Sequence, residues 1–128
     1  MPNPKDVVRR FVDAMNAHDM DAVAACYAPT AQIIYPGRAV QSPTEVASSE
    51  RGMLESVPDY RIEAKGLFEM EGDQVLLELR MSGTQREDLG GKTFEITGAY
   101  IFRIENGQIV EERAYPDIAG LRRQLSPR

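Results

Sequence analysis

Asp117, a carboxylate near the C-terminus, lies at a position where it could act as an acid or a base. Residues 100–117 read as two strands joined by Asn106-Gly107, which is among the strongest hairpin signals. The second strand ends at Asp117, and a short helix is expected over residues 118–125. The carboxylate could exchange protons with a bound molecule, or it could cap the helix by accepting backbone N–H groups. Capping lowers a carboxyl pKa and makes a weaker base, and it is the favoured alternative.

The composition of the 128-residue chain fits one globular domain over residues 1–128. A formal net charge of −5 argues against nucleic acid as a partner, because phosphate binding requires a basic surface. Cys26 is the only cysteine and His18 the only histidine, so neither a disulfide nor a thiolate zinc site is expected. With no signal-peptide core and no run of about 20 apolar residues, we expect no membrane partner and a reduced, cytoplasmic location.

Three helices are expected before the main run of strands. The first opens at Asn3-Pro4, with an Asn cap and a proline in its first turn. The second begins after Asp19 and is ended by Pro29, and residues 32–35 form a short strand. Ser42-Pro-Thr-Glu45 has the pattern of a capping box, so a third helix should begin there.

Three longer strands follow over residues 60–71, 74–84 and 94–105, and tight turns between hairpin partners make them consecutive and antiparallel. One face of the middle strand, which should pack beneath the helices, carries Val75, Leu77, Leu79, Met81 and Gly83. Helices followed by strands predict an α+β domain. We expect three N-terminal helices packed on a curved, mostly antiparallel sheet, with a short C-terminal helix.

Segments near both ends of the chain follow one another in an order that is typical of a known superfamily. Residues 7–21 and 26–31 precede Pro36-Gly37, while FRIENGQIVE at 102–111 and DIAGLRRQL at 117–125 lie near the C-terminus. Together they resemble the nuclear transport factor 2-like superfamily, in particular its branch of SnoaL-like polyketide cyclases and ketosteroid isomerases. The resemblance implies a cone-shaped fold, a pocket between the helices and the concave face of the sheet, and a homodimer. It is specific for fold and weak for reaction, because the superfamily hosts many functions.

The resemblance also implies which residue types should carry chemistry. Catalytic members use carboxylates and tyrosines in an apolar pocket, without a metal or organic cofactor. The isomerase pattern has a tyrosine and two aspartates where this chain has Phe11, Tyr35 and Tyr100. Phenylalanine donates no hydrogen bond and a phenol is a poor base near neutrality, so we do not expect ketosteroid isomerase chemistry.

Two other patterns within the superfamily differ in how well this chain matches them. The limonene epoxide hydrolase pattern has an arginine and two aspartates, approximately where this chain has Met81, Gly83 and Ala114. These apolar residues cannot activate water, so that chemistry is not expected either. The SnoaL-like cyclases use an aspartate near the C-terminus as acid and base, and Asp117 is its best match.

The same resemblance assigns the walls of the pocket. Tyr35 and Tyr100 fall on opposite sides, where their hydroxyls would orient a carbonyl or phenol ligand; the alternative is core aromatics with polar tips at the rim. Apolar side chains that either line a deformable pocket or fill the core are Phe11, Met15, Met53 and Met81.

These expectations combine into two functional hypotheses. The first is a cofactor-free enzyme of cyclase, isomerase or dehydratase type that acts on a small hydrophobic carbonyl compound. Asp117 would then be the acid and base, and Tyr35 and Tyr100 would orient the substrate. The alternative is a non-catalytic small-molecule-binding or assembly domain of the same fold. The direction of the Asp117 carboxylate, into the pocket or onto the helix end, separates the two.

Overall fold

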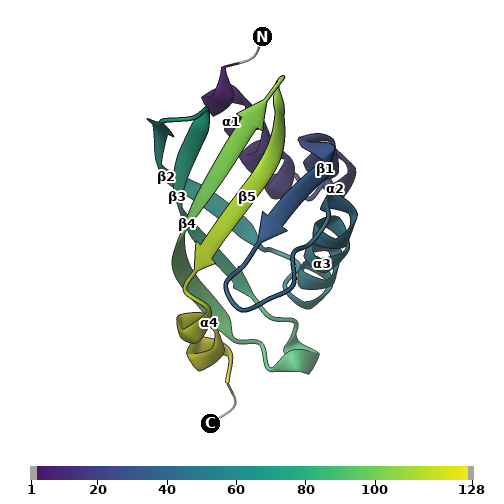
Figure 1. The fold of residues 1–128 in the computed structure, drawn as a ribbon. Helices are drawn as coiled ribbons and strands as arrows, with labels where there is room; N and C mark the ends of the chain where they lie inside the picture. The colour runs from purple at the N-terminus through teal and green to yellow at the C-terminus, as the bar shows by residue number, and fades with distance from the viewer. Residues whose placement is uncertain (1–2, 127–128) are drawn as a thin grey trace.

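The computed structural model describes residues 3–126 and has an α+β fold, as predicted (Figure 1). The helices of this part of the chain are α1 (Pro4–Asn16), α2 (Met20–Ala25), α3 (Pro43–Ser56) and α4 (Ile118–Leu125). The strands are β1 (Tyr27–Ile34), β2 (Arg61–Met70), β3 (Gln74–Thr84), β4 (Thr93–Glu105) and β5 (Gln108–Pro116), with a 3-10 turn at Glu87–Leu89. The helices α1, α2 and α3 lie to one side of a curved sheet, and α4 lies at one end of it.

The sheet has the strand order β1-β5-β4-β3-β2. The pairs β2–β3, β3–β4 and β4–β5 are antiparallel, and β1 pairs with β5 in parallel. The predicted hairpin between β4 and β5 is confirmed, since Asn106 and Gly107 have φ values of 53° and 75°. A two-residue turn with both φ values positive follows the right-handed twist of the strands, and Asn-Gly adopts it at low cost.

The helix starts follow from local hydrogen bonds. The Asn3 side chain accepts from the N–H of Lys5 at 2.8 Å, and Ser42 and Glu45 form the predicted capping box of α3. The prediction for α2 was too long, because this helix ends at Ala25 and β1 begins at Tyr27. Pro29 lies within β1, where the pairing with β5 is irregular, and its missing N–H is tolerated there.

The core lies between the helices and the concave face of the sheet. On β3 the predicted inward positions Val75, Leu77, Leu79 and Met81 are all buried. Helix α1 covers this layer with an apolar face whose central aromatic, Phe11, contacts Phe102 of β4 with ring centroids 5.2 Å apart. The alternation read from the sequence therefore identified the correct face of β3.

A bulge in β5 changes which of its side chains face the core. Arg103 of β4 pairs with Glu111 and the next residue, Ile104, pairs with Ile109, so Val110 is an extra residue in β5. An extra residue reverses the alternation of side chains beyond it. As a result, the Glu112 side chain faces the core, as the Ile109 side chain does. Only 1% of the Glu112 surface is exposed.

Close packing around Gly83 in β3 leaves no room for a side chain. A Cβ at this position would overlap the Val57 side chain and approach Tyr60 Cα to 3.3 Å. We expect Gly83→Ala to lower the free energy of unfolding by about 1–3 kcal/mol, because the backbone before β2 must move away. Urea denaturation measures this change.

Gly52 provides the matched control for that substitution. It lies on the exposed side of α3, and nothing lies within 4 Å of the Cβ that alanine would add. Gly52→Ala should stabilise the protein by about 0.5–1 kcal/mol through helix propensity alone. Equal stability of Gly83→Ala and the original protein would contradict close packing between β3 and residues 57–60.

Candidate functional site

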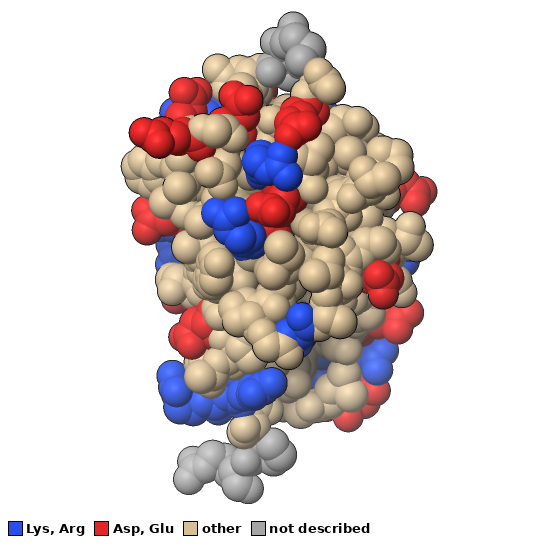
Figure 2. All heavy atoms as spheres, in the orientation of Figure 1, with Lys and Arg blue, Asp and Glu red and all other residues tan. Residues whose placement is uncertain are grey.

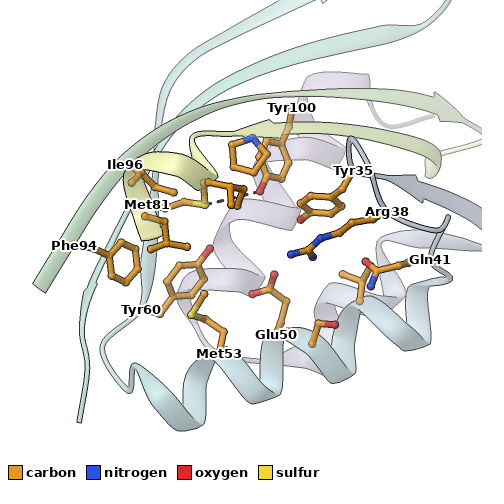
Figure 3. Close-up of a pocket in the computed structure, with 15 residues that line it drawn as sticks. Tyr35, Arg38, Gln41, Glu50, Met53, Tyr60, Met81, Phe94, Ile96 and Tyr100 are labelled. Carbon is orange, nitrogen blue, oxygen red and sulfur yellow. Dashed lines mark hydrogen bonds between the residues drawn. The ribbon is translucent and has the colours of Figure 1, made fainter. Parts of the chain in front are cut away.

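A cavity of about 230 Å³ lies between helix α3, helix α4 and strands β3, β4 and β5 (Figure 3). Its wall is mostly apolar or aromatic, with a few polar groups that converge on the same space. The residues that line it are Tyr35, Arg38, Gln41, Val46, Ser49, Glu50, Met53, Tyr60, Met81, Phe94, Ile96, Tyr100, Pro116, Ile118 and Leu121. A concave apolar pocket with a small number of convergent polar groups is the usual form of a small-molecule site.

Helix α3 supplies the only carboxylate among the residues that line this cavity. Val46, Glu50 and Met53 are spaced by four and three positions, so they share one face of the helix. The capping box at Ser42 fixes where the helix begins, and burial of Val46 turns this face inward. Figure 3 shows the Glu50 carboxylate pointing into the cavity, toward the space between Tyr35 and Tyr60.

The loop after β1 supplies the polar mouth of the cavity. Gly37 has a φ of 74°, which turns the chain immediately after Tyr35. Gln41 then returns to the strand, where its backbone exchanges hydrogen bonds of 2.9 and 3.0 Å with Ile33. The turn places the guanidinium of Arg38 over the Tyr35 ring, with Cζ 5.5 Å from the ring centroid. Arg38 is an exposed residue whose guanidinium points toward the cavity from its mouth.

Tyr60 and Tyr100 form the opposite, deeper part of the wall. The backbone of Tyr60 is held by His18, whose Nε2–H donates to the Tyr60 carbonyl at 2.7 Å. The hydroxyl of Tyr100 donates to Sδ of Met81 at 3.8 Å, and its ring lies 6.4 Å from that of Tyr35. Burial is the main cause that raises the pKa of Tyr35, Tyr60 and Tyr100, so all three hydroxyls remain protonated hydrogen-bond donors.

A narrow inner space continues from the cavity toward α1. Its volume is about 10 Å³, and it is bordered by Phe11, Met15, Tyr27, Glu50 and Glu112 among others. A space of this size holds at most one water molecule. Four residues line both spaces: Tyr35, Glu50, Tyr60 and Tyr100. The inner space, which Glu112 borders, therefore adjoins the main cavity.

Glu112 is held by a hydrogen bond from the Tyr27 hydroxyl to its Oε1. Burial raises the pKa of Tyr27 well above its ordinary value, so this hydroxyl acts as the donor. Burial also raises the pKa of Glu112 from 4.5 to about 7, opposed by the Tyr27 hydrogen bond and assisted by the charge of Glu50. The hydrogen bond therefore only partly offsets the cost of removing the carboxylate from water.

Glu50 titrates in the same range. Burial raises the pKa of this carboxyl from 4.5 to about 7 as well. The charge of Glu50 also contributes to the raised pKa of Glu112, and both carboxyls border one narrow space. Near neutral pH a carboxyl with such a pKa can give up a proton or take it back. This property is what general acid/base chemistry requires of a carboxyl.

The structure brings the sequence-predicted binding residues together. Tyr35, Tyr100, Met53 and Met81 line the main cavity, and Phe11 and Met15 border the inner space. Tyr35 and Tyr100 agree with both interpretations of the sequence. Their rings pack against one another as core aromatics do, and they also line the cavity. Outside the cavity, Arg113 and Glu111 of β5 form an ion pair at 2.7 Å.

Asp117 lies elsewhere. It is the N-cap of α4, and its Oδ1 accepts a hydrogen bond from the N–H of Gly120 at 2.9 Å. The residue is exposed, and the described residues that line the main cavity do not include it. The geometry thus supports the capping alternative for Asp117.

Sequence reasoning missed Glu50 and Glu112, for different reasons. Glu50 had a usable signal, because it interrupts the apolar face of α3 between Val46 and Met53. Glu112 had none in its spacing: strict alternation from Ile109 would direct Glu111 inward and Glu112 outward. The bulge at Val110 reverses this arrangement, and a bulge is a feature of strand pairing rather than of sequence pattern.

The described part of the chain, residues 3–126, contains no cluster of three or more His, Cys, Asp or Glu side chains that could hold a metal ion. None of its helices is long and apolar enough to cross a membrane.

Comparison with known proteins identifies the family of this scaffold. A family model described as a SnoaL-like domain matches residues 8–112. An NTF2-like protein from Burkholderia thailandensis has a similar structure, with 27% identity, a TM-score of 0.83 and coverage of 99% of this chain and 100% of that one. No curated protein matches the chain by sequence.

Two similar structures from Streptomyces carry different functional descriptions. IdmH from Streptomyces antibioticus, described as a candidate polyketide cyclase, has 22% identity and a TM-score of 0.83, covering 97% of this chain and 99% of its own. AclR from Streptomyces galilaeus, described as a candidate hydroxylase, has 20% identity and a TM-score of 0.84, covering 95% of this chain and 80% of its own. At these identities the likeness shows the fold alone.

The raised carboxyl pKa values predict how stability depends on pH. The folded protein keeps protons on Glu50 and Glu112 that an unfolded chain releases above about pH 4.5. The free energy of unfolding should therefore fall as pH rises from about 4.5 to about 7, and then level off. Glu112→Gln should remove a large part of this fall, on the order of 2 kcal/mol between about pH 5 and pH 8.

Urea denaturation across this pH range measures the slope. Glu111→Gln is the control, because Glu111 is the adjacent carboxylate but pairs with Arg113 outside the core. The control should keep the full slope. An unchanged slope in Glu112→Gln would show that Glu112 is ionised in the folded protein across the range.

The Tyr27 hydrogen bond generates a second prediction at this site. Tyr27→Phe removes the donor that favours the ionised form, so the pKa of Glu112 should rise above about 7. Carbon-detected NMR of labelled glutamate carboxyls measures this pKa directly. Tyr115→Phe, which alters an exposed tyrosine, should leave it unchanged. A lower or constant pKa in Tyr27→Phe would refute the role given to this hydrogen bond.

Proposed function

Because the chain belongs to the SnoaL-like domain family, we propose that its cavity is a general acid/base site for a small hydrophobic carbonyl compound. The single observation that carries the proposal is Glu50. This carboxyl points into a largely apolar cavity, and burial raises its pKa to about 7. An acid/base group whose pKa lies near neutrality can both accept and return a proton at useful rates.

The first step of the proposed reaction is proton abstraction next to the carbonyl. The ionised Glu50 carboxylate takes a proton from the carbon adjacent to the carbonyl group, and the C–H electron pair forms an enolate. The Tyr35 and Tyr100 hydroxyls, which face the cavity, donate hydrogen bonds to the carbonyl oxygen as its negative charge develops. Such donors stabilise an oxyanion most effectively where water is excluded.

The fate of the enolate sets the reaction type. Return of the proton to another carbon gives isomerisation. Attack of the enolate carbon on a second carbonyl forms a ring, and Glu50 returns its proton to the new alkoxide. Loss of a β-hydroxyl group, protonated by Glu50 as it leaves, gives dehydration. In each case the proton taken by Glu50 is returned to substrate or product, so the side chain is restored.

Glu112 and Tyr27 support this cycle from the inner space. Glu112 borders the same narrow volume as Glu50 but lies too deep for a substrate larger than water. Its charge state acts on Glu50 through space, so protonation of Glu112 favours the ionised, basic form of Glu50. In this proposal Glu112 is a positioning residue and Glu50 takes the acid/base role that the sequence offered for Asp117.

Deuterium exchange into a model ketone tests the proposal without a known substrate. The probe is 2-tetralone, a flat apolar ketone with exchangeable protons next to its carbonyl. In deuterated buffer near neutral pH, the protein should accelerate exchange of these protons above the buffer rate. Glu50→Gln should lower the protein-dependent rate by about 10²–10⁴-fold, because the amide cannot accept the proton. Proton NMR measures the loss of the α-proton signals.

Asp117→Asn is the matched control for loss of a carboxylate. Asp117 caps α4 outside the cavity, so this variant should keep the exchange rate of the original protein within about twofold. Asn caps a helix about as well as Asp, so the variant should also keep nearly all of its stability. Loss of exchange in folded Asp117→Asn, with Glu50→Gln unaffected, would return the catalytic role to Asp117. No exchange above buffer would favour the non-catalytic binding domain.

A further inference from the structure

The mouth of the cavity continues into a second hollow of about 560 Å³ beside α4. Tyr35, Arg38, Pro116 and Ile118 line both spaces, so the two are joined along one wall. Arg122 of α4 lines the hollow as well. Figure 2 shows Lys and Arg side chains gathered at the end of the molecule where α4 lies in Figure 1.

The charges of this hollow are unbalanced. Most arginines of the described chain pair with a carboxylate, as Arg51 does with Asp21 and Arg80 with Glu63. Within residues 3–126, neither Arg38 nor Arg122 forms such a pair. Asp117 also borders the hollow, and its carboxylate offsets one of the two positive charges. A net positive charge therefore remains at the entrance to the cavity of a protein whose net charge is −5.

We propose that the ligand of this cavity is a carboxylic acid, a compound with an apolar carbonyl-bearing part and one carboxylate. The carboxylate lies at the mouth between Arg38 and Arg122, and the apolar part extends inward to Glu50 and the tyrosines. The identification of the inner part rests on the proposed function. The carboxylate site itself rests on the two arginines and on the continuity of the two spaces.

The geometry of Arg38 suits this role. Its guanidinium is stacked on Tyr35, which reduces the side-chain freedom that would be lost when a ligand binds. A planar guanidinium can donate two parallel hydrogen bonds to one carboxylate, which fixes orientation as well as affinity. Because Arg38 and Glu50 both line the 230 Å³ cavity, a carboxylate held at Arg38 leaves the rest of a one- or two-ring molecule near Glu50.

Glu50 and Arg38, which line the same cavity, also place opposite requirements on a ligand. Glu50 needs a neutral group, since a second negative charge beside it would raise its pKa further. Arg38 needs an anion. A ligand that enters in reverse would place its carboxylate against Glu50 and leave Arg38 unpaired, so the charge pattern selects one orientation.

A matched pair of probes tests this inference by binding alone. The probes are 2-naphthoate and 2-naphthamide, which have nearly the same shape and differ in charge. At about pH 6 naphthoate is ionised while Glu50 remains largely protonated. We expect naphthoate to bind about tenfold or more tightly than the amide, and added salt to weaken only naphthoate. Isothermal titration calorimetry measures both affinities.

Three variants assign the preference to residues. Arg38→Gln should abolish most of the preference for naphthoate and leave the affinity for the amide within about twofold. Arg122→Gln should reduce the preference by a smaller factor, because this side chain lies farther out on α4. Arg123→Gln is the control, since Arg123 is an equally basic neighbour on α4 that does not border either space.

Equal binding of the two probes to the original protein would overturn the inference. So would a parallel loss of both probes in Arg38→Gln, because Arg38 would then only support the shape of the cavity. These outcomes are independent of the acid/base proposal, which depends on exchange into a neutral ketone. Loss of the naphthoate preference with normal ketone exchange, or the reverse, would identify which of the two proposals fails.

Discussion

The buried hydrogen bond between Tyr27 and Glu112 is the constraint around which this cavity is organised. A carboxyl with 1% of its surface exposed is costly in the core, and the Tyr27 hydroxyl is the partner that makes it tolerable. The bond joins β1 to β5, the one parallel pair of the sheet. It also places a second titratable carboxyl against the narrow space that Glu50 borders, where the charge of Glu50 adds to the burial that raises the pKa of Glu112.

The remaining walls are fixed by short-range devices that act at the ends of elements. A capping box fixes the start of α3, and the buried side chains of Val46 and Ala47 turn the face that carries Glu50 inward. The end of α1 is tied to the start of β2, because the Asn16 side chain both donates to and accepts from the backbone of Ile62 at 2.8 Å. With His18, this contact holds Tyr60 against the cavity. Rigid supports of this kind are needed to keep a site in one geometry.

The sequence was informative wherever structure depends on neighbouring residues. The Asn106-Gly107 turn, the alternation in β3 and the capping box are local signals, and each was confirmed. The inward position of Glu112 depends instead on how β5 pairs with β4, which no window of sequence contains. The start of β1 was missed for a related reason, because pairing with β5 prevails over the turn signal of Pro29. Residues of the pocket wall could thus be anticipated, while the buried carboxyl could not.

The same reasoning separates what this scaffold shares from what this chain adds. Proteins of very similar backbone are described as a candidate cyclase and a candidate hydroxylase, so the cone-shaped fold does not determine the reaction. Reaction type must then depend on which titratable groups reach the cavity and where fixed charge lies at its mouth. In this chain a carboxyl near neutral pKa lies within and Arg38 lies at the entrance. A carboxyl and a guanidinium that line one otherwise apolar cavity favour ligands that carry both a neutral apolar part and an anionic group.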